Sequence, residues 1–456
     1  MGGPLSKAKP MKQSERGDAA QPATFGPGGP LKGRAAVPGD KSISHRALMF
    51  AAMAAGRSRI EGLSEGGDVR ATAEALGAMG VGIARRLGGW DVDGVGAGAL
   101  LQPARALDMG NSGTSTRLLM GLVATHPIAA TFIGDESLCR RPMDRVIAPL
   151  SRLGADVAAS AGGRLPLTLR GLSGAVATEF RLAVASAQVK SALLLAGLNA
   201  SGTTRVIEPV PTRDHTERML KAFGADIETG AMEDGERLVS LKGEAELTPR
   251  IVAVPADPSS AAFLIVAALI VPGSEIRLDG VGVNPTRIGL FETLRAMGAD
   301  LTFENPRDLG GEPVADIIVR HSPLEAVDVP PEVVPAMIDE FPIFFVAAAF
   351  ARGESRARGL AELRVKESDR IAAMARGLRA IGAKVEEAED GLAIEGSGGD
   401  PLPGGATVAS ELDHRIAMSF AVAGLHCRQP LTVDDMTPVE TSFPGFTATL
   451  RALAAA

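Results

Sequence analysis

The chain of 456 residues is too long for one ordinary hydrophobic core and fits two domains of about 200 residues each. Its 45% apolar and 22% charged residues are typical of a soluble globular protein, and its longest apolar runs, 261–271 and 343–350, are well short of the roughly 20 residues that a membrane span needs. The net charge of −7 with no basic block argues against nucleic acid as a partner, but small anionic substrates stay open if the cations gather in one pocket.

The first thirty residues and the cysteines set further limits. Residues 1–30 are rich in Gly, Pro, Lys, Gln and Ser without apolar periodicity, which predicts a disordered N-terminal tail. Two cysteines, Cys139 and Cys427, are too few for a disulfide framework, and no paired Cys or His spacing indicates a metal site. We therefore expect a reducing compartment, the cytoplasm, and no metal.

A unit made of a helix end, a glycine and a strand recurs along the chain. In each copy, apolar residues at helical spacing precede a glycine that can take the left-handed cap conformation, and an alternating strand follows. A sixth copy, at 450–453, ends before its glycine would occur. Six units that cannot bury their apolar faces alone predict an α/β repeat protein. The five glycines are Gly80, Gly154, Gly224, Gly298 and Gly382.

A longer period divides the six units into two sets of three. The segment 37–44, Val-Pro-Gly-Asp-Lys-Ser-Ile-Ser, is echoed by the segment 254–261, Val-Pro-Ala-Asp-Pro-Ser-Ser-Ala, which begins 217 residues later (254 minus 37). Two Pro-containing segments at equivalent places fit the two strands of a hinge between lobes. A chance match of Pro, Asp and Ser is the alternative.

Polar clusters at the starts of apolar helices hold the first candidate binding residues. In 39–46, Lys41 and Ser42 fall at a helix N-terminus, where free backbone N–H groups favour an anion. An ordinary N-cap by Ser42 or Ser44 is the alternative. The loop 110–117, Gly-Asn-Ser-Gly-Thr-Ser-Thr-Arg, lets a ligand approach the backbone closely, or is simply a tight turn.

Three clusters follow later in the chain. Residues 140–145 hold three arginines, which more often form a solvated face than a site, and 185–191 open a long apolar helix with polar residues that cap or bind. Asp339 and Glu340 precede the apolar segment 341–350, so we expect a partly desolvated carboxylate with a raised pKa, suited to proton transfer. The charged run 364–370 is either a surface ion-pair network or part of a site.

Five arginines occupy similar places in successive units, 10 to 13 residues before the unit glycine. They can therefore converge in a cleft between two facing lobes, and a cleft that gathers cations in an acidic protein suits a small polyanion. The five are Arg70, Arg141, Arg213, Arg287 and Arg370, of which Arg70 and Arg287 are the candidates for purely structural roles.

Together these motifs resemble those of the 5-enolpyruvylshikimate-3-phosphate synthase family, in the family's order. They are Pro-Gly-Asp-Lys-Ser-Ile-Ser-His-Arg (38–46), Gly-Asn-Ser-Gly-Thr (110–114), Arg-Pro-Met (141–143), Ser-Ala-Gln-Val-Lys-Ser-Ala (186–192), Arg-Val-Lys-Glu-Ser-Asp-Arg (364–370) and Asp-His-Arg-Ile-Ala-Met (413–418). The resemblance implies an α/β (α+β) fold, a two-lobed inside-out α/β barrel built of six βαβαββ repeats, three per lobe. It implies a first lobe of 31–38 plus 255–456, a second lobe of 39–254 and an active site in the cleft between them.

The resemblance also implies a reaction and a set of site residues. The enolpyruvyl group of phosphoenolpyruvate would move to the 5-hydroxyl of shikimate 3-phosphate by addition and elimination, with release of phosphate, as a step of chorismate and aromatic amino acid biosynthesis. The partners would be these two small molecules, with no metal or organic cofactor, and we expect a monomer. By resemblance, shikimate 3-phosphate is bound by Lys41, Ser42, Arg46, Ser186, Ala187, Gln188, Arg213, Asp339 and Lys366. Phosphoenolpyruvate is bound by Lys41, Asn111, Gly113, Arg141, Gln188, Glu367, Arg370 and Arg415.

Three of these residues resemble the family's catalytic groups. Asp339 corresponds to the base that takes the proton of the 5-hydroxyl, and Glu367 with Lys41 to the donor of the proton to the methylene carbon. Ala187 stands where many members have serine, and Thr441 where many have lysine, as in the glyphosate-tolerant subgroup. That subgroup often has alanine at the position of Gly113, which here leaves room for the inhibitor, so we expect glyphosate sensitivity.

Two other functions remain as alternatives. The UDP-N-acetylglucosamine enolpyruvyl transferase shares the fold and the donor and uses a loop cysteine as acid, but Cys139 lies two residues before Arg141 rather than about five. A non-enzymatic six-module ring that encircles DNA is more remote, because the net charge of −7 disfavours it.

Overall fold

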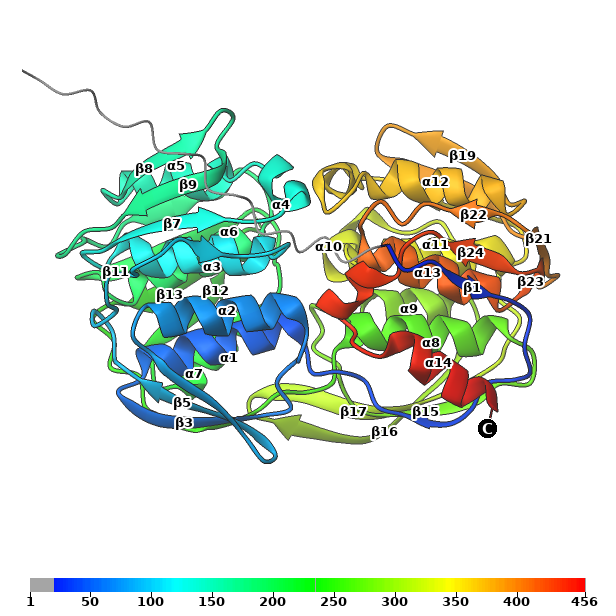
Figure 1. Cartoon of the computed structure of the whole chain (residues 1–456), viewed down its shortest axis with the longest axis horizontal. Helices are drawn as coiled ribbons and strands as arrows, with labels where there is room; N and C mark the ends of the chain where they lie inside the picture. The colour runs from blue at the N-terminus through cyan, green and yellow to red at the C-terminus, as the bar shows by residue number, and fades with distance from the viewer. Residues whose placement is uncertain (1–19, 234, 456) are drawn as a thin grey trace, which may run out of the picture.

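The chain folds into two lobes that lie side by side (Figure 1). The computed structural model describes residues 20–233 and 235–455. Within these ranges the buried apolar side chains form two clusters, one from residues 43–254, which we call the core of the second lobe, and one from residues 25–35 and 261–453, the core of the first lobe. Each core is covered by its own helices and sheets.

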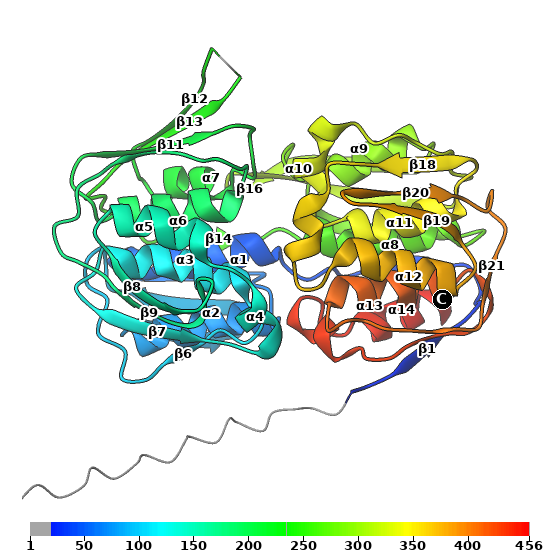
Figure 2. The ribbon, with the colours of Figure 1, turned by 90° about the horizontal axis from the view of Figure 1, so that it is seen from above.

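Helices run side by side inside each lobe, and sheets lie along the outside (Figures 1 and 2). The helices of the second lobe are α1 (Lys41–Met53), α2 (Gly67–Ala78), α3 (Gly113–Ala124), α4 (Glu136–Arg140), α5 (Asp144–Arg152), α6 (Ala187–Gly197) and α7 (His215–Ala222). Those of the first lobe are α8 (Pro258–Ile270), α9 (Gly289–Ala296), α10 (Val334–Met337), α11 (Phe341–Phe350), α12 (Arg370–Ala380), α13 (His414–Gly424) and α14 (Phe446–Ala455), with 3-10 turns η1 (Pro331–Val333), η2 (Ala361–Val365) and η3 (Thr437–Thr441).

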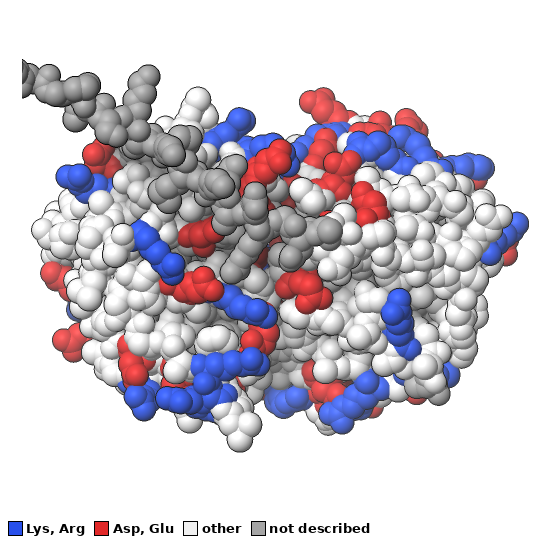
Figure 3. All heavy atoms as spheres, viewed as in Figure 1, with Lys and Arg blue, Asp and Glu red and all other residues white. Residues whose placement is uncertain are grey.

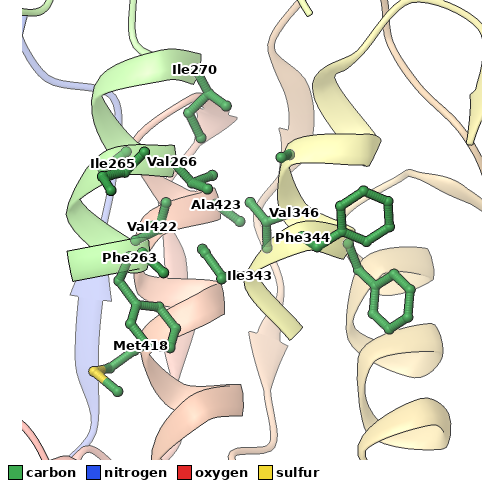
Figure 4. Close-up of a cluster of buried hydrophobic side chains, with 14 of the residues drawn as sticks. Phe263, Ile265, Val266, Ile270, Ile343, Phe344, Val346, Met418, Val422 and Ala423 are labelled. Carbon is green, nitrogen blue, oxygen red and sulfur yellow. The ribbon is translucent and has the colours of Figure 1, made fainter. Parts of the chain in front are cut away.

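The centre of the first lobe consists of α8, α11 and α13, whose residues are all buried. Val266 of α8, Val346 of α11 and Ala423 of α13 meet there (Figure 4). Complete burial explains why most of α8 and α11 reads as continuous apolar runs without helical periodicity. No single described helix is both long and apolar enough to cross a membrane; residues 331–337 and 341–350 meet that criterion only as a pair, which is bent by 117°.

Four sheets share one topology, in which a parallel pairing is followed by two antiparallel pairings. Their strand orders are β14-β3-β5-β4, β6-β7-β9-β8, β10-β11-β13-β12 and β2-β15-β17-β16. The strands are β2 (Lys32–Ala35), β3 (Gly56–Glu61), β4 (Gly82–Arg86), β5 (Gly89–Gly94), β6 (Leu107–Asp108), β7 (Ala129–Ile133), β8 (Asp156–Ser160), β9 (Arg164–Arg170), β10 (Glu179–Arg181), β11 (Thr203–Glu208), β12 (Ile227–Ala231), β13 (Arg237–Lys242), β14 (Ile251–Ala253), β15 (Glu275–Gly282), β16 (Asp300–Leu309) and β17 (Glu312–Arg320). A fifth sheet, of β18 (Glu354–Ala357), β20 (Gly391–Glu395) and β19 (Lys384–Ala388), repeats the antiparallel part.

This arrangement confirms the predicted mixed α/β fold. The described strands form separate sheets rather than one closed barrel of strands. The unit glycines end their helices in the left-handed conformation, as predicted, with φ of +94°, +102°, +92°, +90° and +94° at Gly80, Gly154, Gly224, Gly298 and Gly382. Glycine reaches this conformation without steric cost, so each helix can turn directly into the next strand.

The sixth unit is completed from the other end of the chain. Its strand β24 (Leu431–Val433) pairs in parallel with β22 (Thr407–Val408) and antiparallel with β1 (Ala23–Phe25), beside a short sheet of β21 (Leu402–Gly404) and β23 (Cys427–Gln429). Phe25 is buried in the core of the first lobe. The predicted disordered tail is therefore wrong at β1, because this strand pairs with β24 and covers an edge that would otherwise be unpaired. Residues 1–19 lie outside the described residues.

The two Pro-Asp segments run beside each other between the lobes. The N–H of Asp40 donates to the carbonyl of Pro255 (2.8 Å), and the N–H of Asp257 donates to that of Pro38 (2.9 Å). Each aspartate then caps the helix that follows it, Asp40 for α1 and Asp257 for α8. The echo between the two segments in the sequence therefore reflects equivalent structural positions.

Candidate active site in the cleft between the lobes

A cavity of about 420 Å³ lies between the lobes, and residues of both lobes line it. Most of the predicted site residues are among them: Lys41, Ser42, Arg46, Gly113, Arg141, Ser186, Ala187, Gln188, Arg213, Asp339, Lys366, Glu367 and Arg415. The remaining two lie directly behind the lining. Asn111 accepts a hydrogen bond from Arg141, and Arg370 donates one to Glu367.

The cavity carries the opposite charge to the chain. Nine Lys and Arg side chains and five Asp and Glu side chains line it, an excess of four positive charges (9 minus 5), whereas the whole chain has a net charge of −7. Acidic and basic side chains are interspersed on the face that Figure 3 shows. A small polyanion would therefore be attracted to the cleft rather than to that face.

The N-terminus of α1 presents Lys41 and Ser42 to the cavity. Asp40 is the N-cap, accepting from the N–H of Ile43 (2.8 Å), so neither Ser42 nor Ser44 caps this helix. The Lys41 ammonium donates to Asp68 of α2 (2.9 Å). One turn along the helix, Arg46 is buried against α6 and α7, and burial lowers its pKa to about 10.

Two further helix N-termini meet the cavity from the second lobe. Ser112 caps α3, so that Gly113 is its first residue, and Ser186 caps α6 by accepting from Val189 (3.3 Å). Gln188 is held in place from both sides, since its amide donates to Thr114 (3.0 Å) and its carbonyl accepts from Arg117 (2.9 Å). Free N–H groups at such ends favour anionic ligands.

Asp339 lies among cations of both lobes. It contacts Arg213 at 2.6 Å, and Lys366 and Arg370 at 3.5 Å each. Burial alone would raise the pKa of Asp339, but Lys366, Arg213 and the other nearby cations outweigh it, so the pKa lies well below the usual value. The predicted raised pKa is therefore wrong: the sequence places an acid beside an apolar helix but does not show the cations that surround it.

Glu367 is held in the same way. It contacts Arg370 at 2.6 Å and Arg141 at 3.5 Å. Burial would raise the pKa of Glu367, but these two arginines lower it well below the usual value. The charged run 364–370 is thus part of the site, not only a surface network. Arg415 completes this side by donating to the backbone carbonyl of Asp339 (2.8 Å).

Direct contacts cross the cleft. Arg213 meets Asp339 near the centre, Arg145 meets Glu362 at 2.6 Å, and the Ser137 hydroxyl donates to the Glu367 carbonyl (3.1 Å). The lobes are therefore already close together around the cavity.

The cavity lining also includes residues with charge or acid–base capacity that were not predicted as site residues, and three of them lie beside predicted ones. Arg117 lies beside Arg141, and burial together with that neighbouring charge lowers its pKa to about 10. His414, the first residue of α13, is buried, and burial and the nearby Lys41 hold its pKa well below the usual value, so the imidazole is neutral. Asp68 is the third. Arg117 and His414 lie in or next to motifs that the sequence singled out, whereas nothing in the sequence relates Asp68 to Lys41.

Of the five arginines in the unit register, Arg141, Arg213 and Arg287 line the cavity, and Arg370 lies directly behind the lining. Arg70 does neither: it is exposed and donates to the carbonyl of Glu65. Cys139 is not among the residues that line the cavity; its thiol donates to the carbonyl of Gly134, and burial raises its pKa. In the described part of the chain, no three His, Cys, Asp or Glu side chains are placed to hold a metal ion.

A cleft between two lobes, lined by excess cations and two buried carboxylates, is the site of an enzyme that acts on small anions. The sequence profile of the EPSP synthase (3-phosphoshikimate 1-carboxyvinyltransferase) family matches residues 26–450. The 3-phosphoshikimate 1-carboxyvinyltransferases of Sphingopyxis alaskensis and Novosphingobium aromaticivorans are 62% and 61% identical, over 95% and 94% of this chain and 98% and 99% of theirs. The chain belongs to the EPSP synthase family.

Solved structures agree. An EPSP synthase from Acinetobacter baumannii superposes with a TM-score of 0.83 at 46% identity, covering 95% of this chain and 98% of that one. The enolpyruvyl transferase NikO from Streptomyces tendae, at 20% identity and a TM-score of 0.73, shares the fold, covering 95% of this chain and 98% of that one.

Proposed function

We propose that this enzyme transfers the enolpyruvyl group of phosphoenolpyruvate to the 5-hydroxyl of shikimate 3-phosphate and releases phosphate. The observation that carries the proposal is the excess of four positive charges around a cavity in an acidic protein. The two substrates together bring about six negative charges, counting about two for each phosphate and one for each carboxylate. At an effective dielectric constant near 20, two like charges 4 Å apart repel by about 4 kcal/mol, so both substrates need cations to share one cavity.

The two substrates are assigned to two sides of the cavity. Shikimate 3-phosphate contacts the second lobe through the N-termini of α1 and α6, with Arg213, Lys366 and Asp339 around its ring. Phosphoenolpyruvate binds across the cleft, between cations of both lobes. The groups that hold it are Lys41, Asn111, Gly113, Arg141, Gln188, Glu367, Arg370 and Arg415, to which we add Arg117 because it lies beside Arg141 and lines the cavity. Every residue of this site comes from one chain, so the site needs no second subunit. The lobes that meet here are 31–38 plus 255–456, to which β1 also belongs, and 39–254.

Asp339 takes the proton of the 5-hydroxyl as the base. Its low pKa keeps it ionised before the substrate binds, which a base requires, but also makes it a weak base. Shikimate 3-phosphate supplies anionic groups for Arg213 and Lys366, which weakens their hold on the carboxylate. Substrate binding therefore raises the basicity of Asp339 when the hydroxyl arrives.

Glu367 and Lys41 supply the proton to the methylene carbon. The Lys41 ammonium lines the cavity, where its contact with Asp68 holds it in place as the acid. Glu367 is ionised while Arg141 and Arg370 hold it, so it can donate only after phosphoenolpyruvate has engaged those arginines and its pKa has risen. The protonated carbon leaves its neighbour electrophilic, and the hydroxyl adds there as it loses its proton. The tetrahedral intermediate then expels phosphate while the new methyl group loses a proton, which restores the carbon–carbon double bond of the enolpyruvyl group.

The experiment is phosphate release from phosphoenolpyruvate with shikimate 3-phosphate, compared with the same assay on Lys41→Met. We expect turnover by the natural protein and near-complete loss in the variant. Turnover with UDP-N-acetylglucosamine in place of shikimate 3-phosphate would instead identify the other enolpyruvyl transferase and refute the proposal.

We also propose that the enzyme is inhibited by glyphosate. A Cβ at position 113 would lie 2.8 Å from Arg117 Nη1 and 3.2 Å from Arg141 Nη1, so glycine leaves space beside the cations of the phosphoenolpyruvate side. The resemblance of Ala187 and Thr441 to the tolerant subgroup does not fill this space. An inhibition constant far above the Michaelis constant for phosphoenolpyruvate would contradict this expectation.

A further inference from the structure

Arg287 occupies the junction of the two lobes, where none of the reaction steps above uses it. Its side chain is 2% exposed, and it lies just before α9 of the first lobe. One nitrogen, Nη1, donates to Asp40 (2.9 Å), and the other, Nη2, donates to Asp257 (3.4 Å) and to the Ser259 hydroxyl (2.8 Å). A single guanidinium thus binds the N-caps of α1 and α8, which belong to different lobes.

The contact continues toward the catalytic carboxylate. The hydroxyl of Ser259 donates to the buried Glu340, which follows Asp339 in the chain. On the other side, Asp40 directly precedes Lys41. Arg287 therefore links the two groups assigned to proton transfer, each through its neighbour in the chain. Asp40 connects it to Lys41, the proposed proton donor in the second lobe. Ser259 and Glu340 connect it to Asp339, the proposed base in the first lobe.

Stability alone does not account for this cluster. Two buried carboxylates, those of Asp40 and Asp257, share one guanidinium, and the buried Glu340 meets it through the Ser259 hydroxyl. Burial and the charge of Asp40 raise the pKa of Asp257. Buried ion clusters of this kind are often no more stabilising than apolar residues of the same volume, because desolvation offsets the attraction. What an arginine adds is a planar fork that fixes two carboxylates at a set separation.

We propose that Arg287 is a positioning residue that sets the approach of the two lobes and thereby the distance between Lys41 and Asp339 across the bound substrates. The inference rests on the roles given to those two residues in the proposed function. It predicts that loss of the Arg287 guanidinium slows the chemical step, which needs groups from both lobes. The binding of shikimate 3-phosphate to the second lobe should change little. An error of about 1 Å in such a placement can cost about 100-fold in rate.

The test compares Arg287→Gln and Arg287→Lys with Arg70→Gln. Arg70 is the matched control, because it lies 217 residues earlier (287 minus 70), the spacing that relates the two Pro-Asp segments. Unlike Arg287, it is exposed, and it donates to the backbone carbonyl of Glu65. The measurements are kcat and the KM for phosphoenolpyruvate from phosphate release, and the Kd for shikimate 3-phosphate alone from calorimetry.

For Arg287→Gln we expect kcat to fall at least 10-fold and the KM for phosphoenolpyruvate to rise, while the Kd for shikimate 3-phosphate changes less than 3-fold. Arg70→Gln should leave all three unchanged. If Arg287→Gln does not fold, Arg287→Lys decides the test, because lysine keeps the charge but lacks the planar guanidinium. Assayed well below its melting temperature, Arg287→Lys should have a kcat at least 5-fold lower than that of the natural protein. Wild-type kinetics in folded Arg287→Lys, or equal losses in kcat and in shikimate 3-phosphate affinity, would overturn the inference. Failure of the proposed function would show differently, as no phosphate release by the unaltered protein.

Discussion

Replacing Lys190 by methionine tests whether a buried charge cluster supports the shikimate 3-phosphate side of the cleft. Lys190 lies in α6 with no exposed surface, and its ammonium contacts Glu208 of β11 and Glu217 of α7 at 2.8 Å each. Neighbouring residues on the same two helices bind Arg46. Ser191, which follows Lys190 on α6, and Thr216, which precedes Glu217 on α7, each accept a hydrogen bond from Arg46 at 2.7 Å. The cluster therefore holds together the helices that position Arg46.

The expected loss of stability follows from what the substitution leaves behind. Methionine fills much of the volume, but two buried carboxylates lose their cation, and breaking a buried pair in this way costs about 3–5 kcal/mol. With an unfolding entropy of about 2.1 cal/mol/K per residue over a lobe of about 200 residues, a loss of about 4 kcal/mol lowers the melting temperature by about 10 °C.

The assay uses the single tryptophan of the chain, Trp90 in β5, which reports unfolding of the second lobe by its fluorescence. Lys221→Met is the control, because it makes the same substitution on the exposed side of α7 and should shift the midpoint by less than about 1 °C. We also expect the Kd for shikimate 3-phosphate to rise in Lys190→Met. A melting temperature within 2 °C of the natural protein would refute the reasoning, since it would mean that the carboxylates do not depend on Lys190.

Three further predictions test pH dependence, cleft packing and the inhibitor site. Burial lowers the pKa of His45 well below its unfolded value of about 6.5. The contribution of His45 to the free energy of unfolding is therefore complete above that pH, and it falls below that pH by up to about 1.4 kcal/mol per pH unit. Urea titrations at a series of pH values should show a shallower fall in His45→Gln. Gly66→Ala would place a Cβ 2.3 Å from the Thr441 carbonyl of the other lobe and should reduce kcat/KM at least 10-fold, whereas Gly77→Ala, with nothing within 4 Å, should be neutral. Gly113→Ala should raise the inhibition constant of glyphosate more than the KM for phosphoenolpyruvate, and equal changes in the two constants would contradict it.

The sequence predicts most of the candidate site residues that line the cavity because they lie in short local motifs. Lys41 and Ser42 belong to one helix start, Lys366 and Glu367 to one turn, and each motif keeps its members together wherever the fold places it. The unit glycines were predictable for a similar reason, since a helix end followed by a strand is a local pattern. Contacts between motifs were not predictable: the pair of Lys41 with Asp68 depends on how α1 packs against α2.

The pKa of Asp339 was predicted wrongly for the same reason, because it depends on contacts between motifs that are distant in the sequence. Its position before an apolar helix correctly indicates burial, and burial alone would raise the pKa. The cations that reverse the shift come from residues 213, 366 and 370, which are distant in sequence or belong to the other lobe. The strand β1 was missed because three residues between Gly- and Pro-rich segments carry little signal, and its partner β24 is about 400 residues away in the chain (β1 at 23–25, β24 at 431–433).

The same cations have two effects on this site, and the two effects oppose each other until the substrates bind. The excess positive charge attracts polyanions, but it also keeps Asp339 and Glu367 ionised, which for Glu367 is the wrong state for donating a proton. In the proposed function, shikimate 3-phosphate offsets the cations around Asp339 but not Arg141, which is assigned to the phosphoenolpyruvate side. Under that assignment Glu367 gains a proton only when phosphoenolpyruvate itself is present, so the charges proposed to bind the second substrate also delay the acid step until that substrate is in place.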